Sequence, residues 1–68
     1  MNKYEAEQLF TESKLEARKI EHINITRKIR AVKMIFSDRH DITFFIYEGS
    51  ISKIEEYNGR ECIEKYVK

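Results

Sequence analysis

The sequence has one cysteine, two glycines, no proline and no tryptophan in 68 residues. The single cysteine, Cys62, excludes an intramolecular disulfide and fits a reducing compartment. Gly49 and Gly59 are too few for a glycine-rich loop that would hold a phosphate or an oxyanion. No apolar run approaches the roughly 20 residues of a membrane-spanning helix, and the first residues lack the apolar core of a secretory signal. We therefore expect a cytoplasmic protein without membrane contact.

The chain is long enough for a single domain, residues 1–68, and too short for two hydrophobic cores. Hydrophobic residues make up 41% of it, with four Tyr and four Phe, and this composition argues against disorder. Thirteen basic and twelve acidic residues leave a net charge of +1, which predicts neither strong overall attraction to nucleic acid nor mimicry of a polyanion. Because so small a domain buries little surface, it depends on good packing or on association with another chain.

The first segment predicts a helix from Asn2 to about Ile23. Asn2 and Glu5 have the spacing of a capping box. Small and apolar residues also recur at helical spacing along one stripe, which consists of Ala6, Leu9, Phe10, Ser13, Ala17 and Ile20. The small members of this stripe would allow the helix to approach a sheet closely.

Three later segments predict strands, at residues 23–37, 42–47 and 51–57. They are rich in β-branched and aromatic residues, and apolar residues alternate along the first of them. Turn-forming polar residues separate the segments. The register of the third strand stays open, because Ile51 and Ile54 share a face only if a bulge lies between them.

A tight turn at residues 38–41 predicts a hairpin in which Met34 pairs with Phe45 and Val32 pairs with Tyr47. Both faces of this hairpin are then apolar near the turn. A single helix covers one face, so the other must be covered by the rest of the chain or by another molecule.

The last segment has two interpretations. As a helix, it places Cys62, Ile63, Tyr66 and Val67 on one face. As a fourth strand after the Asn58-Gly59 turn, it places Glu61 opposite Glu56, a like-charge pair that disfavours this pairing. We therefore expect an α+β fold in which an N-terminal helix packs on a three-stranded antiparallel sheet (α-β-β-β), with a short C-terminal helix.

Two groups of residues resemble a reactive site. Asp38, His40 and Asp41 have side chains that ligate metals, but successive side chains of a tight turn diverge, and Asp is favoured in turns by its local hydrogen bonds. Cys62 with His22 or His40 could form a nucleophile and base, yet no nucleophile motif accompanies them, and a buried apolar thiol is the simpler interpretation. We expect no catalytic residue, metal, cofactor or small-molecule substrate.

The segment 26–33 carries four cations and no acid. Cations beside aromatic side chains are typical of protein-interaction surfaces and also of sheets that bind single-stranded nucleic acid. Alternatively, these cations pair with glutamates later in the chain. The predicted partner-binding residues are Lys28, Arg30, Val32, Met34, Phe45 and Tyr47. The residues predicted for nucleic-acid binding are Arg27, Lys28, Arg30, Lys33, Phe45 and Tyr47.

These patterns favour a small non-enzymatic protein-interaction module that acts through steric and electrostatic occlusion. In size and composition it is typical of phage or mobile-element accessory proteins that inhibit or regulate a host protein. The partner is another protein or a second copy of the chain. The alternative is a nucleic-acid-binding module that uses the basic segment 26–33 and the neighbouring aromatic residues.

Overall fold

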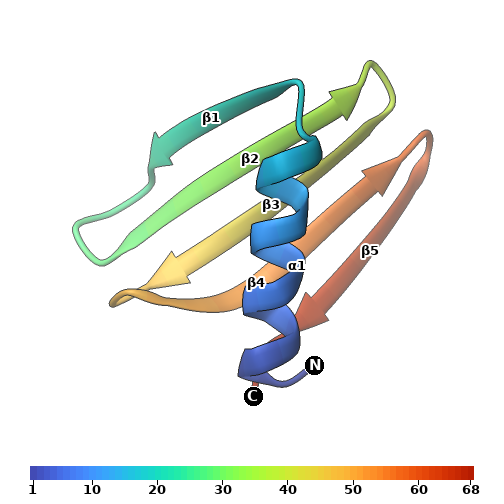
Figure 1. Cartoon of the computed structure of the whole chain (residues 1–68). Coiled ribbons are helices and arrows are strands. Elements are labelled where there is room, and N and C mark those ends of the chain that lie inside the picture. The colour runs from blue at the N-terminus through green and yellow to red at the C-terminus, as the bar shows by residue number, and fades with distance from the viewer.

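The computed structural model describes all 68 residues as one helix and one five-stranded antiparallel sheet (Figure 1). The elements are α1 (Lys3–Glu16), β1 (Lys19–Asn24), β2 (Ile29–Ser37), β3 (His40–Tyr47), β4 (Ser50–Asn58) and β5 (Glu61–Tyr66). The strands lie in the sheet in chain order, so each pairs with the next through a hairpin. Figure 1 shows α1 crossing one face of the sheet, while no element covers the opposite face.

The capping box that the sequence predicts is confirmed at the start of α1. The Asn2 side chain accepts a hydrogen bond from the Glu5 backbone N–H at 2.8 Å, and the Glu5 carboxylate accepts one from the Asn2 N–H at 3.2 Å. The predicted end at Ile23 is wrong, because α1 ends at Glu16 and Ala17 is extended. Residues Lys19–Asn24 form β1 instead, where their backbone groups pair with β2.

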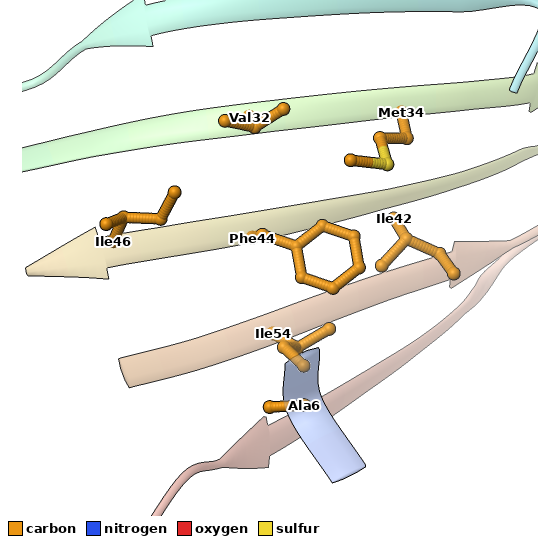
Figure 2. Close-up of a cluster of buried hydrophobic side chains, with 7 residues drawn as sticks. All are labelled: Ala6, Val32, Met34, Ile42, Phe44, Ile46 and Ile54. Atoms are coloured by element: carbon orange, nitrogen blue, oxygen red, sulfur yellow. The ribbon is translucent and has the colours of Figure 1, made fainter. Parts of the chain in front are cut away.

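The hydrophobic core lies between α1 and the sheet (Figure 2). The predicted helical stripe is confirmed as far as Ser13, since Ala6 and Ser13 are buried and Phe10 packs edge-on against the buried Phe44 with ring centroids 5.0 Å apart. Its last two members, Ala17 and Ile20, lie beyond the end of α1, with Ile20 in β1. The core cluster consists of Ala6, Val32, Met34, Ile42, Phe44, Ile46 and Ile54. Small residues on α1 therefore lie where the helix meets the large side chains of the central strands.

The predicted register of the β2–β3 hairpin is wrong by three residues. Val32 lies opposite Phe44 rather than Tyr47. Two features cause the shift: the two-residue loop is Asp38-Arg39, one position earlier than predicted, and Phe36 is an extra, unpaired residue near the end of β2. A register shift by an odd number of residues places the side chains of one strand on the opposite face from the one predicted, relative to the partner strand.

As a consequence, the four hairpin residues that were predicted to form one partner-binding surface lie on opposite faces of the sheet. Val32 and Met34 are buried beneath α1. Phe45 and Tyr47 alternate with the core residues of β3 and therefore point away from α1.

The third predicted strand corresponds to β4, and it contains the bulge that its sequence requires. Ser52 is the extra residue in the ladder between β3 and β4. Ile51 and Ile54 therefore both lie on the α1 side of the sheet, where Ile54 is buried and Ile51 packs against the core.

The three-stranded sheet and the C-terminal helix are corrected to a five-stranded sheet, although the general α+β class holds. The last segment forms β5, which pairs with β4. The loop consists of Gly59-Arg60, so Glu61 lies opposite Asn58 and the expected repulsion with Glu56 does not arise. Gly59 has a φ of +65°, which glycine adopts at little cost.

With 14 residues and a largely polar surface, α1 is neither long nor apolar enough to cross a membrane.

The core position of Phe44 gives a direct test of the fold. Phe44→Ala should lower the free energy of unfolding by about 3–5 kcal/mol because it removes a fully buried ring, which is a large part of the stability of so small a domain. Leu15→Ala, a truncation of a side chain 82% exposed on α1, should change it by less than about 0.5 kcal/mol. Urea unfolding followed by circular dichroism measures both, and equal destabilisation would contradict this packing.

Candidate functional site

The open face is the side of the sheet that α1 does not cover. Residues paired across neighbouring strands share a face, so the open face consists of rows that run across the sheet. The aromatic row is Ile23, Ala31, Phe45, Lys53 and Tyr66. The charged row is Glu21, Lys33, Thr43, Glu55 and Glu64. The third row, which we call the turn row, is Lys19, Ile35, Asp41, Tyr57 and Cys62.

The end of the open face near the β1–β2 turn is apolar. Ile29 and Tyr47 form a further pair beside the aromatic row, and Ile25 follows β1. Ile23, Ile25 and Tyr47 are each nearly half exposed, and Tyr66 is 60% exposed. Large exposed apolar patches on small proteins mark surfaces that contact another molecule.

Lys53 connects the aromatic row to the charged row. Its ammonium lies 5.6 Å from the ring centroid of Phe45 and 5.7 Å from that of Tyr66. The same Nζ lies 3.2 Å from Glu55 and 3.7 Å from Glu64, two acids that face each other across β4 and β5. The hydrogen bond with Glu55 raises the pKa of Lys53 above its ordinary value, against the effect of desolvation. Lys53 thus offsets the like-charge pair between the last two strands.

A shallow hollow of about 940 Å³ lies at the other end of the open face, beside the β2–β3 and β4–β5 turns. Three cations and two carboxylates contribute to its wall, which is formed by Lys33, Asp38, Arg39, Asp41, Thr43, Tyr57, Gly59 and Arg60. A hydrogen bond with the Cys62 thiol raises the pKa of Tyr57 above its ordinary value. Nowhere in the chain do three His, Cys, Asp or Glu side chains gather in a metal-binding group.

The structure divides the predicted basic residues among three places. Lys33 lies in the charged row of the open face. Arg30 lies on the α1 side of β2, opposite Ile46. Arg27 and Lys28 lie in the β1–β2 turn, where the Lys28 ammonium is 3.9 Å from Glu48. These cations therefore do not form one continuous surface with Phe45 and Tyr47.

The residues weighed as a metal or acid–base site are also separated. The Nε2 atom of His40 lies 2.8 Å from Oε2 of Glu56 on the α1 side of the sheet, whereas Asp41 belongs to the open face and Asp38 to the loop. Cys62 is exposed on β5, an edge strand, so the expectation of a buried thiol is wrong. Cys62 and His40 lie on opposite faces, and His22 lies on β1 at the far edge.

The sequence contained a signal for part of the open face. Ile23, Ile29, Ala31 and Ile35 occupy alternate positions, and the structure places all four on this face. They belong to two strands instead of one, because residues 25–28 form a turn in which the Thr26 hydroxyl accepts hydrogen bonds from two backbone N–H groups. Lys53 and Tyr66 were missed, since their place in the aromatic row depends on β5.

Comparisons with protein-family models, with curated proteins and with solved structures found no match to this chain. The feature that remains to indicate a function is the open face, where exposed aromatic and aliphatic side chains lie beside a row of acids and one lysine.

The bridging position of Lys53 predicts a stability effect. Lys53→Met keeps most of the apolar stem but leaves Glu55 and Glu64 without their shared cation, so it should lower the melting temperature by a few degrees at low salt. Adding Glu64→Gln to this variant should recover most of the loss, because the repulsion is then removed. Because the folded pKa of Lys53 is raised, the stabilisation is complete below the ordinary lysine pKa and is lost as pH rises through the raised value. Failure of Glu64→Gln to restore stability would contradict this role.

Proposed function

We propose that this chain is a non-enzymatic protein-interaction module that binds another polypeptide through the open face. The observation that supports the proposal is the uncovered side of the five-stranded sheet, which exposes Ile23, Tyr47 and Tyr66 around the partly buried Phe45. Aromatic side chains dominate the energetically important part of protein interfaces, because they bury a large area with few rotatable bonds.

The charges of the open face favour a polypeptide partner over a polyanion. Acids outnumber cations among its three rows, which hold Lys19, Lys33, Lys53, Glu21, Asp41, Glu55 and Glu64. Binding to nucleic acid depends on neutralising phosphates, and a face without an excess of cations does this poorly. Charges of both signs instead suit another protein surface of complementary pattern, where they set orientation and exclude wrong partners.

The mechanism is occlusion. The apolar end of the open face supplies affinity by removing its side chains from water. The charged row then sets the direction in which the partner lies. A partner held in this way loses access to the surface that it buries, which is how a domain of 68 residues can inhibit or regulate a larger protein without a reaction of its own.

The open face can be tested by comparing two tyrosines. Tyr47 lies on the open face, whereas Tyr4 lies on α1 and is 67% exposed. Tyr47→Asp should abolish retention of the polypeptide partner, whether another protein or the chain itself, and Tyr4→Asp should leave it unchanged. The measurement is capture on each immobilised variant, with bound polypeptides identified and quantified by mass spectrometry. The proposal is contradicted if all variants retain the same polypeptides equally or if nuclease removes them.

The nucleic-acid alternative predicts a different salt dependence. Under our proposal, a fluorescent single-stranded oligonucleotide should bind no more tightly than about 10⁻⁴–10⁻⁶ M at physiological salt, the range of non-specific contacts. Fluorescence anisotropy at several salt concentrations measures this. Tight binding that weakens steeply with salt and is lost in the double variant Lys28→Glu and Arg30→Glu would favour the alternative.

A further inference from the structure

The partner that best fits the open face can be inferred from the face itself. We propose that it is a second copy of this chain, packed face to face so that the two sheets form a sandwich with one α1 on each outer side. This inference rests on the proposed function, because it names the partner of the same surface.

The dimensions of the open face suit a stable dimer. The chain measures 30 × 23 × 23 Å, so a sheet face of 30 × 23 Å has a projected area of about 690 Å². Burying this face on both copies would remove roughly 1,400 Å² from water, which lies in the range of specific protein interfaces. Only nine of the 68 residues are buried in the single chain, and small domains with so limited a core are commonly stabilised by association.

Two-fold symmetry allows two simple ways to stack the open faces. In the first, the axis runs across the strands along the charged row. Each charged residue of that row then faces the same residue of the second copy, so Lys33 lies near Lys33 and Glu55 near Glu55. The apolar aromatic row also lies over the more polar turn row. Like charges in contact oppose association, so this arrangement is disfavoured.

In the second arrangement, the axis runs along β3, and β2 of one copy lies over β4 of the other. Each row then faces the same row of the second copy in reverse order. Lys33 lies over Glu55 of the second copy, and Glu55 lies over its Lys33. Phe45 meets its own copy on the axis, and Ile23 lies over Tyr66 of the second copy. Sheets that pack in alignment cross at about 30°, which keeps these central partners close.

The contacts that oppose this second arrangement lie at its margins. Glu21 on the edge strand β1 would lie over Glu64 on β5, but each already has a cation within the chain. Lys19 is 3.8 Å from Glu21, and Lys53 is 3.7 Å from Glu64. Asp41 would face its own copy at the hollow, where the surface recedes and three cations contribute to the wall. The central pairs are therefore complementary, and the like-charge contacts are partly neutralised.

This arrangement predicts a charge-exchange experiment. Lys33→Glu places two acids against each other, and Glu55→Lys places two cations against each other, so each variant alone should weaken the dimer at least about tenfold. An equimolar mixture of the two variants should recover a dimer. The acid introduced at position 33 of one variant then faces the cation introduced at position 55 of the other. The second pair of the interface is the native one, Glu55 of the first variant with Lys33 of the second. The double variant should also dimerise. Wild type should show twice the chain mass of 8.2 kDa.

The measurement is sedimentation equilibrium over a series of concentrations, with circular dichroism to show that every variant is folded. A second pair of variants tests the same interface without exchanging charges. Phe45→Glu puts two carboxylates together on the axis and should give a folded monomer, whereas Tyr4→Glu on α1 should remain a dimer. A dimer that persists in Phe45→Glu, or a mixture that stays monomeric, would overturn the proposed arrangement.

The outcomes separate this inference from the proposed function. A wild type that stays monomeric at all concentrations, yet retains another polypeptide in a Tyr47-dependent manner, overturns the second copy as partner and leaves the protein-interaction function intact. A monomer that retains no polypeptide contradicts both. A dimer with the predicted response to charge exchange supports both.

Discussion

The structure depends on one constraint, which is that a single helix of 14 residues packs against one face of a five-stranded sheet. All seven members of the core cluster lie between α1 and that face. Ala6 and Ser13 bring the helix close to the sheet, and the large side chains of the three central strands fill the space beneath it. Within residues 1–68, the segments outside α1 form the strands and their short turns, so none of them covers the opposite face.

The two exposed edges of the sheet also result from the small number of residues outside the helix and the strands. The strands are joined in chain order by short hairpins, so β1 and β5 are both edge strands. Exposed edges invite pairing with other chains, and charged side chains discourage it. Glu61, Glu64 and Lys65 on β5, with Lys19 and Glu21 on β1, serve this purpose. The apolar side chains of the open face are therefore available for contact, while the strand edges are comparatively protected.

Local features of the fold could be predicted from the sequence, and features that depend on distant pairing could not. The capping box and the buried stripe of α1 depend on spacing within the helix, and both are present. The β2–β3 register depends on Phe36, whose unpaired position gives no distinctive sequence signal and exchanges the predicted faces of Val32 and Met34. The assignment of β5 failed for a similar reason. The expected repulsion between Glu61 and Glu56 assumed a turn centred on Asn58-Gly59, whereas the loop is Gly59-Arg60 and brings Glu61 opposite Asn58. The apolar composition of a second sheet face was nevertheless evident, because alternation is a local property.

The small core also links stability to binding. Any molecule that binds only the folded chain stabilises it in proportion to its concentration and affinity. A domain with so few buried residues gains a larger share of its stability from such binding than a domain with a large core. Phe45 and Tyr66, held beside the same ammonium, would pass from partial exposure to burial when the open face is covered. Covering this face would therefore complete the hydrophobic packing that α1 provides on the other side, so that the surface proposed for function is also the part of the fold that a single chain leaves unfinished.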